Sequence, residues 1–589
     1  MYDGAMNNKT TLRTHSCGEL TIDDKGKKVT LCGFLHSVRD LGHVIFFVLR
    51  DFYGITQVLV SDEKQKEQVR AISRESTLSI TGKVIERSSP NPQIPTGLIE
   101  IEPTKIEVLG ACTENLPFEV HLSTGMREDA RLKYRFLDMR NPEVKDKLVL
   151  RSNIVASLRR RMIDKGFLEI TTPILTSSSP EGARDFIVPS RLHHGQFYAL
   201  PQAPQQFKQL LMAGGFDKYF QIAPCFRDED ARADRSPGEF YQLDLEMAFA
   251  SQEDVFALIE SVIPQLFEEF TTKQVDKPPF RRIAYKDCLN EFGSDKPDFR
   301  NPLRITDATK LFAGGLLGSI VPMFIGKFVK AIVVDFDKPR SFIEKDICET
   351  AKNNEIDGIY WVRMDGEMEF VGGIAKFFNI KDRVIKKLEL KPNSFIVFVA
   401  HEKEELCLKQ AGFVRSLLGE KLNILDKDAF NFCWVVDYPM YELDDEGKVA
   451  FSHNPFSMPQ GGKAVLDKKK PLDILAYQYD LVCNGIELSS GAVRNYCPET
   501  MVKAFKIAGY GQEVIEEKFS ALFNAFKFGA PPHAGIAPGL DRMVMLLADE
   551  PNIREVIAFP MNKSAQDLLM GAPNAVEDKQ LVEVGIKLK

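Results

Sequence analysis

The apolar spacing of the chain changes at Glu143, and this change sets the strongest limit on the fold. Before it, residues 12 to about 117 hold five short β-rich runs near ten-residue spacing, broken by glycine or charge. After it, apolar residues recur at helical spacing in a run that Gly166 closes. The chain has 589 residues, which is too long for one hydrophobic core. We therefore expect several domains, the first all-β and the later ones mixing helices with strands.

The five β-rich runs predict a small barrel of the OB-fold type, which has five strands. The pattern alone is equally typical of a generic β-domain. In "VIFFVL", Phe46 and Phe47 are adjacent, so alternation lets only one of them face outward.

Further changes of pattern divide the rest of the chain. The segment "TENLPFEVH" indicates a linker, and residues 299 to 425 form a unit with its own strands and a final helix. The run "LEITTPIL" predicts a strand that ends at Pro173. The expected segments are a β-barrel (1–117), a hinge or linker (118–142), the first part of a larger domain of helices and strands (143–298), an insertion in that domain (299–425), the second part of the same domain (426–560) and a C-terminal extension (561–589).

Several classes of protein are excluded by simple counts. The formal net charge is −7 with a pI of about 5.9, so any nucleic-acid contact needs locally gathered basic residues. The ten cysteines include no CxxC pair, which argues against a zinc site or a disulfide framework and favours a reducing, cytosolic compartment. We expect no signal peptide and no membrane partner, since no apolar run approaches the ~18 residues of a span.

A highly charged loop is the first candidate for chemistry. "CFRDEDARADRSPGEF", residues 225–240, carries eight charges in sixteen positions between two apolar runs, so it predicts the tip of a hairpin. Its arginines offer the fixed, permanently charged donors that a triphosphate needs, and a carboxylate beside them can accept from the exocyclic amine of adenine. The alternative is a solvated tip with surface ion pairs of little energetic value.

Two later segments favour a nucleotide site. "YDLVCNGIELSSGAVRNY" places Asp480 and Glu487 seven residues apart, which suits Mg²⁺ held by a few carboxylates and by substrate phosphates. "PPHAGIAPGLDRMVMLL" runs from small residues into an apolar helix that begins near Arg542. The chain has neither a P-loop nor a Rossmann GxGxxG motif, and "GGLLG" in the insertion is interpreted as a turn or tight packing.

These segments together resemble class II aminoacyl-tRNA synthetases. "FRDED" and the later "GLDR" are similar to motifs 2 and 3 of that class, and "RRRMIDKGFLEITTPIL" is similar to motif 1, whose terminal proline, here Pro173, lies at the dimer interface in the family. The order of segments resembles that of bacterial-type aspartyl-tRNA synthetases, whose insertion is called the GAD domain. The resemblance covers nearly the whole chain and includes "SPEGARDFIVPSR", "PQQFKQLLM", "GSDKPD", "HNPF" and "IREVIAFP". It implies an α+β multidomain protein: an N-terminal OB-fold barrel, a six-stranded antiparallel catalytic sheet flanked by helices, and an inserted α+β GAD domain.

The resemblance implies a role for each matching residue. In the ATP site, Arg227 would bridge the α-phosphate and the substrate carboxylate, Glu229 would hold the adenine amine, and Arg542 would bind the γ-phosphate. Asp480 and Glu487 would ligate Mg²⁺. The remaining residues implied for ATP are Asp228, Ser236, Gly539, Leu540 and Asp541. Those implied for aspartate are Glu181, Gln205, Lys208, Arg227, Gln242, Asp244, His453 and Arg494, with Lys208 and Arg494 recognising the side-chain carboxylate.

Four positions depart from the family pattern. Asn454 replaces a frequent second histidine, and Ala203 replaces a serine. Ser236 stands where relatives often carry a glutamine that contacts ATP, and Gly238 is an extra residue whose role the sequence leaves unassigned. None of these changes removes a charged anchor. The resemblance implies that Lys208 points inward, which favours aspartate over asparagine, because a neutral amide would leave a buried ammonium unpaired.

The resemblance also implies a tRNA partner and a homodimer. On the barrel, Phe46 would stack on an anticodon base, and Arg39, Gln57 and Glu100 match positions that hydrogen-bond anticodon bases. Leu41 and Asn91 replace the histidine and glycine common in enzymes that charge both tRNA(Asp) and tRNA(Asn), which favours tRNA(Asp) alone. Charging of both remains the alternative, since other segments resemble lineages with dual specificity.

Two other classes of function fit the sequence less well. A synthetase-like regulatory protein should have lost some of its anchors, whereas Arg227, Glu229 and Arg542 are all present. A plain single-stranded nucleic-acid-binding protein leaves the carboxylate pair and the order of the motifs unexplained.

Overall fold

The computed structural model describes residues 9–178, 183–312, 321–378 and 381–588. Its contacts divide the chain into two compact units, Met1–Glu119 and Val120–Lys589. Each unit is described by itself. Among the described residues, none of the helices is both long and apolar enough to cross a membrane.

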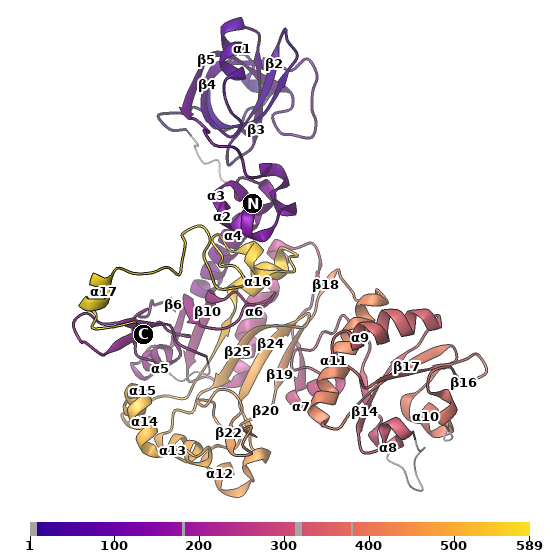
Figure 1. The fold of residues 1–589 in the computed structure, drawn as a ribbon. Coiled ribbons are helices and arrows are strands. Elements are labelled where there is room, and N and C mark those ends of the chain that lie inside the picture. Colours follow the sequence, from indigo (N-terminus) through magenta and orange to yellow (C-terminus); the bar gives the residue numbers. More distant parts are fainter. Residues whose placement is uncertain (1–8, 179–182, 313–320, 379–380, 589) are drawn as a thin grey trace. The chain divides into compact units, whose positions relative to one another are not determined.

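The first unit is the predicted five-stranded closed barrel, with strand order β1-β2-β3-β5-β4 (Figure 1). Inward side chains alternate with outward ones along each strand, so Phe47 is buried in the barrel core while Phe46 lies on the outer face. Its elements are η1 (Ile22–Asp24), β1 (Lys28–Asp40), β2 (Ile45–Arg50), β3 (Ile55–Val60), α1 (Glu63–Arg70), β4 (Thr77–Glu86) and β5 (Ile99–Gly110).

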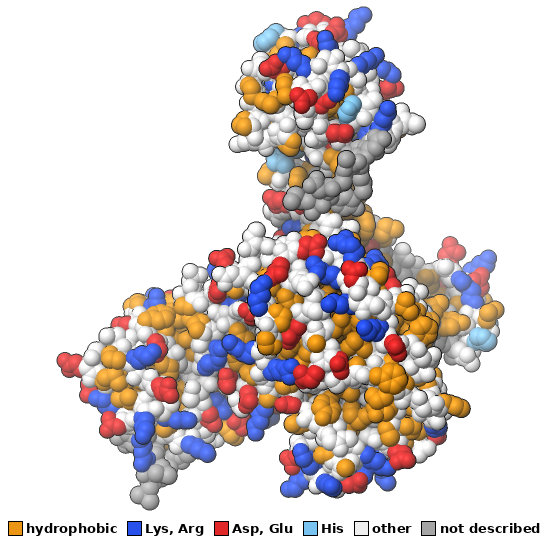
Figure 2. All heavy atoms as spheres, turned by 180° about the vertical axis from the view of Figure 1, so that it is seen from behind, with side chains coloured by type: hydrophobic (Ala, Val, Ile, Leu, Met, Phe, Trp, Pro, Cys, Tyr) orange, Lys and Arg blue, Asp and Glu red, His pale blue; other side chains and the backbone are white. Residues whose placement is uncertain are grey.

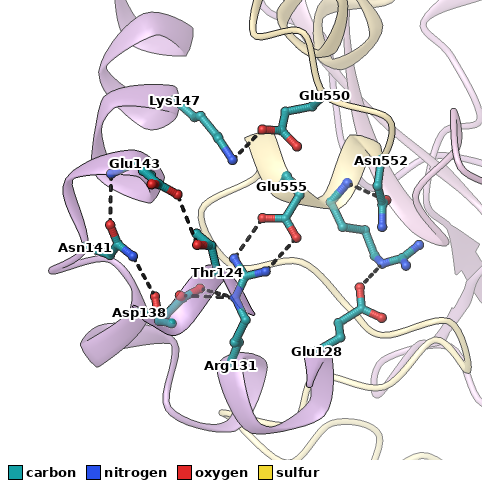
Figure 3. Close-up of polar contacts among 12 residues, drawn as sticks. Thr124, Glu128, Arg131, Asp138, Asn141, Glu143, Lys147, Glu550, Asn552 and Glu555 are labelled. Atoms are coloured by element: carbon teal, nitrogen blue, oxygen red, sulfur yellow. Dashed lines mark hydrogen bonds and ion pairs between the residues drawn. The ribbon is translucent and has the colours of Figure 1, made fainter. Parts of the chain in front are cut away.

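The start of the second unit, predicted as a linker, forms short helices that are tied to a distant segment. These are η2 (Val120–Gly125), α2 (Glu128–Lys133) and α3 (Arg135–Asp138). Arg131 forms a two-pronged ion pair with Glu555 at 2.8 Å and also contacts the fully buried Asp138 at 3.2 Å (Figure 3). Because such buried pairs are costly to break, this segment is a packed support rather than a free tether.

The sheet that the resemblance expects to be catalytic, here called the catalytic sheet, has eight strands in the order β12-β19-β24-β25-β26-β10-β9-β6. The six inner strands are antiparallel, as expected, and β12 and β6 add a short parallel strand at each edge. The predicted "LEITTPIL" strand is wrong beyond Glu169, after which the chain leaves the sheet, and Pro173 is exposed. The strands are β6 (Leu168–Glu169), β9 (Lys218–Arg227), β10 (Gly238–Ala248), β12 (Arg281–Ala284), β19 (Phe432–Val436), β24 (Gln478–Cys483), β25 (Ile486–Val493) and β26 (His533–Pro538).

Three helices, α4 (Pro142–Asp164), α6 (Gln252–Phe270) and α16 (Leu540–Leu547), bury their apolar stripes against this sheet. Helix α4 begins at the Asn141 cap, and the left-handed Gly166 follows its end, as the sequence predicts. The shared core includes Leu158, Ile259 and Met543 from the helices, and it holds the sheet rigid under the candidate site.

Residues 299–425 contain a second sheet of five strands, in the order β13-β14-β17-β15-β16 and antiparallel throughout. Helices pack on it around two apolar clusters of its own. The "GGLLG" run lies outside the described residues. The elements are β13 (Ile305–Asp307), α8 (Thr309–Phe312), η3 (Pro322–Phe324), β14 (Phe328–Val334), η4 (Phe342–Glu349), α9 (Thr350–Lys352), β15 (Ile359–Met364), β16 (Phe370–Val371), η5 (Ala375–Phe377), α10 (Lys381–Leu388), β17 (Ser394–His401) and α11 (Glu404–Lys421).

The remaining elements surround the catalytic sheet (Figure 1). They are β7 (Ile187–Pro189), β8 (Phe197–Ala199), α5 (Gln205–Ala213), β11 (Gln274–Val275), α7 (Tyr285–Phe292), β18 (Ala429–Phe430), β20 (Tyr438–Pro439), β21 (Tyr441–Leu443), β22 (Val449–Phe451), η6 (Gly462–Ala464), α12 (Val465–Lys468), η7 (Pro471–Asp473), β23 (Leu475–Ala476), α13 (Pro498–Ile507), α14 (Gln512–Lys518), α15 (Ser520–Lys527), η8 (Ile553–Val556) and α17 (Asp578–Glu583).

Candidate active site

One cleft of about 970 Å³ over the catalytic sheet gathers most of the predicted site residues. It is lined by strands and loops that are far apart in sequence, so only the folded sheet can bring them together. The predicted residues that line it are Gln205, Lys208, Arg227, Glu229, Ser236, Gln242, Asp244, His453, Glu487, Arg494, Gly539, Asp541 and Arg542. Asp228, Leu540 and Asp480 adjoin lining residues in the chain or the sheet, and Glu181 lies outside the described residues.

The charged loop between β9 and β10 forms one wall of the cleft. Glu229 accepts a hydrogen bond from Arg235 at 2.6 Å, and Asp234 forms an ion pair with Arg542 at 3.2 Å. Arg227 stacks 5.0 Å above the ring of Phe240. Charged residues of the loop therefore form ion pairs with one another and with Arg542, whereas the charges of a freely solvated tip would face water.

The extra glycine in this loop has a backbone role. Gly238 opens β10 with a φ of +79°, a left-handed conformation in which a side chain is strained. It pairs with Arg227 in the ladder, so the turn that returns the chain to β10 depends on a residue free to adopt this angle.

The strands β24 and β25, here called the carboxylate hairpin, carry Asp480 and Glu487. Asp480 is buried and accepts a hydrogen bond from the Tyr438 hydroxyl at 2.6 Å, while its Oδ1 makes no hydrogen bond of good geometry to the described residues. Burial, and then the neighbouring Glu487, raise the pKa of Asp480 to about 7. The Ser490 hydroxyl also acts to lower the pKa of Asp480, but an oxygen that makes no hydrogen bond of good geometry still suits a cation.

No cluster of three or more acidic, histidine or cysteine ligands occurs among the described residues. Two protein carboxylates are nevertheless enough for Mg²⁺ when substrate phosphates complete its shell. The residues present therefore fit a magnesium ion that arrives with a nucleotide.

At the other end of the cleft, two buried cations face two buried carboxylates. Lys208, from α5, contacts Asp244 at 2.6 Å and Glu246 at 3.5 Å. Arg494 donates two hydrogen bonds to Glu246, at 2.9 and 3.0 Å. All four side chains are at most 2% exposed, and their charges balance.

Burial and these contacts shift the two carboxyl groups in opposite directions. Burial raises the pKa of Asp244 more than Lys208 lowers it. Burial also acts to raise the pKa of Glu246, but Arg494 and Lys208 together bring it below its ordinary value. Glu246 is therefore the firmly ionised member of the pair.

Two buried polar atoms in this part of the cleft are poorly satisfied within the protein, although the Tyr219 hydroxyl lies near enough to Asp244 to lower its pKa. Asp244 Oδ2 and Gln205 Nε2 make no hydrogen bond of good geometry to the described residues. An unsatisfied buried acceptor and donor cost free energy, so both suit a ligand that brings a cation and an anion.

Sequence reasoning missed Glu246 and Lys296. Glu246 is two residues from Asp244 on β10, and this spacing in a strand places both carboxylates on one face, which was the available signal. Gly535, on the neighbouring strand, leaves room for the Glu246 carboxylate, with which an added Cβ would clash. Lys296 lines the cleft from "GSDKPD", a segment that the resemblance singled out without a role.

The predicted anticodon residues lie on the first unit. Arg39 is paired opposite Phe46 across β1 and β2, so both share the outer face. Gln57 donates a hydrogen bond to Glu100 at 2.6 Å. Leu41 is exposed in the turn after β1, and the Asn91 side chain accepts from the Gln93 amide at 3.0 Å.

Two protein families match the chain, one within each of its two units. Residues 127–563 match the family described as tRNA synthetases class II (D, K and N). Residues 29–109 match the family described as OB-fold nucleic acid binding domain. Both predicted folds are thus confirmed.

Relatives of known name cover almost the whole chain. It is 51% identical over 585 residues to "Aspartate--tRNA ligase" of Streptomyces coelicolor, covering 98% of each chain. It is 52% identical over 586 residues to "Aspartate--tRNA(Asp/Asn) ligase" of Zymomonas mobilis, again covering 98% of each. Among solved structures, a putative aspartyl-tRNA synthetase from Leishmania major matches with a TM-score of 0.59 at 20% identity, covering 94% of this chain and 95% of that one, which supports the fold.

Proposed function

The chain belongs to the class II tRNA synthetases of the D, K and N group, and on that premise we propose that it is an aspartate–tRNA ligase. It activates L-aspartate with ATP and transfers the aspartyl group to the 3′ end of tRNA(Asp). The observation that carries the substrate assignment is the buried pair of cations, Lys208 and Arg494, at one end of a cleft whose other end is rich in arginine.

The amino-acid end suits aspartate in charge and in hydrogen bonding. The side-chain carboxylate binds Lys208 and Arg494, whose four-charge cluster is neutral before the substrate enters. The substrate ammonium binds Asp244 through the unsatisfied Oδ2. Once the ammonium takes up the charge of Asp244, Lys208 needs the negative charge of the side-chain carboxylate, which the neutral amide of asparagine does not bring.

The chemistry is two displacement steps that need no protein nucleophile. The α-carboxylate of aspartate attacks the α-phosphorus of ATP, giving aspartyl-adenylate and releasing pyrophosphate. A ribose hydroxyl of the terminal adenosine then attacks the carbonyl carbon and releases AMP. Arg227 stabilises the charge that develops at the α-phosphate, Glu229 holds adenine and Arg542 holds the γ-phosphate.

Asp480 and Glu487 would hold Mg²⁺, which would supply charge neutralisation to the phosphates. The unsatisfied Oδ1 of Asp480 supports this assignment. Glu487 lines the cleft beside Arg542, so the carboxylate proposed to hold Mg²⁺ lies next to the arginine proposed to bind the γ-phosphate.

The test of this function is aminoacylation with aspartate, using purified tRNA(Asp) and tRNA(Asn) in separate reactions. We expect charging of tRNA(Asp) and much weaker charging of tRNA(Asn), because of Leu41 and Asn91 on the barrel. Relatives with about equal identity carry either name, so identity does not decide between them. Equal charging of both would overturn the narrower specificity, and charging of neither would overturn the function.

The barrel gives a prediction about tRNA binding. Phe46→Ala should weaken tRNA(Asp) binding by about 1–3 kcal/mol, because a stacking partner for one base is lost. Aspartate-dependent ATP–pyrophosphate exchange, which needs no tRNA, should not change. Phe52→Ala, in the turn between β2 and β3, is the exposed control. An unaltered tRNA dissociation constant in the Phe46 variant would remove this residue from the interface.

The second unit also carries an exposed apolar face that suits a second copy of the chain. Residues 168–176 run from the sheet edge to the β7–β8 hairpin, with which Thr176 pairs. Figure 2 shows hydrophobic side chains gathered over this unit. The exposed hydrophobic residues of these segments are Leu168, Ile174, Leu175, Ile187, Val188, Phe197 and Tyr198. Burying such a patch against its symmetric counterpart would form a homodimer near Pro173.

Ile174→Glu should therefore convert the protein to a monomer in sedimentation velocity, because it places a charge in the apolar interface. Leu443→Glu, an equally exposed apolar site on the β21–β22 hairpin, should leave the sedimentation coefficient unchanged. A native protein that sediments as a monomer would contradict the homodimer.

A further inference from the structure

Lys296, to which the proposed function gives no role, lines the cleft beside Glu487 and Arg542. Its ammonium nitrogen lies 2.7 Å from Asp295 Oδ2 and 3.4 Å from Glu487 Oε2. About a third of its side chain remains exposed, so a ligand in the cleft can reach the ammonium group.

The segment that carries Lys296, residues 293–298, is fixed on the side of the inserted sheet. It follows α7 and leads into residues 299–425. Gly293 has a φ of +67° and approaches Gly412 of α11 so closely that an added Cβ would clash with the backbone there. The start of the segment therefore cannot shift without moving α11.

The other end of the segment is fixed to the carboxylate hairpin. Asp298 packs against Gly485 in the turn between β24 and β25, where an added Cβ would lie 3.3 Å from the Asp298 Cβ. Arg300 donates to Asp298 at 2.8 Å and to the main-chain carbonyl of Asn484 at 3.4 Å. Lys296 is consequently held in a constant position relative to the hairpin.

Glu487 lies between two cations. Its Oε1 is 3.8 Å from Arg542 Nη1, and its Oε2 is 3.4 Å from Lys296 Nζ. Arg542 is the residue to which the proposed function assigns the γ-phosphate. An ammonium group has three donors, and Asp295 and Glu487 supply two acceptors, so one donor is left for an anion in the cleft.

We infer that Lys296 binds the β,γ-phosphate end of ATP together with Arg542, and the same phosphates in pyrophosphate. This inference rests on the proposed function, which brings a triphosphate to this end of the cleft. Lysine suits the role because it acts as a compact point charge toward phosphate oxygens. Because Lys296 sits where the insertion begins, the fold of residues 299–425 also helps to position a phosphate ligand.

The test compares two ligands that differ in the β and γ phosphates. Calorimetry on Lys296→Met should show ATP binding weakened about tenfold or more, because a charged hydrogen bond is lost. Binding of the sulfamoyl analogue of aspartyl-adenylate, which lacks these phosphates, should stay within about twofold of the native value. The KM for pyrophosphate in the reverse reaction should rise with the dissociation constant of ATP.

Two further variants complete the experiment. Lys296→Arg keeps the charge and should recover most of the ATP affinity, and Lys286→Met, an exposed lysine on α7, should bind both ligands normally. If the variant loses affinity equally for ATP and for the analogue, the inference is overturned and Lys296 is purely structural. Unchanged ATP binding would also overturn the inference. Aspartate-dependent exchange by the native protein, run in parallel, separates this failure from a failure of the proposed function.

Discussion

Lys208→Leu is expected to nearly abolish the activation of aspartate. Removing one partner of a buried, hydrogen-bonded charge pair costs about 2–5 kcal/mol, and each 1.4 kcal/mol is a factor of ten. The kcat/KM for aspartate in ATP–pyrophosphate exchange should therefore fall by about thirtyfold or more. The KM for ATP should change little, because Lys208 lies at the amino-acid end of the cleft, on α5 beside Asp244.

The same variant should also discriminate less well between aspartate and asparagine. Without the ammonium, the charge that favours aspartate over asparagine is halved, so inhibition by asparagine should strengthen relative to binding of aspartate. Lys218→Leu, an exposed lysine on β9, is the matched control and should retain normal kinetics. A normal KM for aspartate in Lys208→Leu would refute the assignment of this pocket.

The parts of the fold that follow from periodicity were predictable from sequence. Alternation in the barrel strands requires one of Phe46 and Phe47 to be buried, and helical spacing with a closing glycine marks the helix that ends before Gly166. The strand expected through Pro173 is shorter because it lies at the sheet edge with Leu168 and Glu169 both exposed, and its last ladder hydrogen bond runs from the Ile170 amide to the Phe220 carbonyl. The helices of residues 120–138 were missed because helices this short are marginal alone and depend on distant partners such as Glu555.

The site was predictable wherever a residue belongs to a motif. Arg227 and Arg542 come from separate motifs, and the structure places both in one cleft. Glu246 could not be identified by a motif, because its importance arises from a contact with Arg494, 248 positions away in sequence. Gly238 likewise belongs to no motif, because its role lies in the positive φ of its backbone.

Glu246→Gln should destabilise the second unit and impair aspartate binding together. Arg494 is fully buried and depends on Glu246 for two charged hydrogen bonds, whereas glutamine offers a single neutral acceptor. Breaking a buried ion pair by removing one partner costs about 3–5 kcal/mol in unfolding free energy. Because Arg494 also loses its orientation, the KM for aspartate should rise at least about tenfold.

The destabilisation should depend on pH in a defined direction. The pKa of Glu246 is lower in the folded protein than in the unfolded chain, so its ionised form stabilises the fold above the unfolded pKa. This contribution is lost as the pH falls through the folded pKa. The difference in unfolding free energy between native protein and variant should therefore be full at neutral pH and shrink below about pH 4.

Calorimetric or denaturant unfolding across this pH range, paired with aspartate kinetics, tests both effects. Glu239→Gln changes an exposed carboxylate on the same strand and should alter neither quantity. A Glu246→Gln protein with native stability and a native KM for aspartate would mean that Arg494 is held by other contacts. A loss of stability with a native KM would instead mean that Glu246 stabilises the fold but is not needed for substrate recognition. Arg494 would then bind the substrate carboxylate without Glu246.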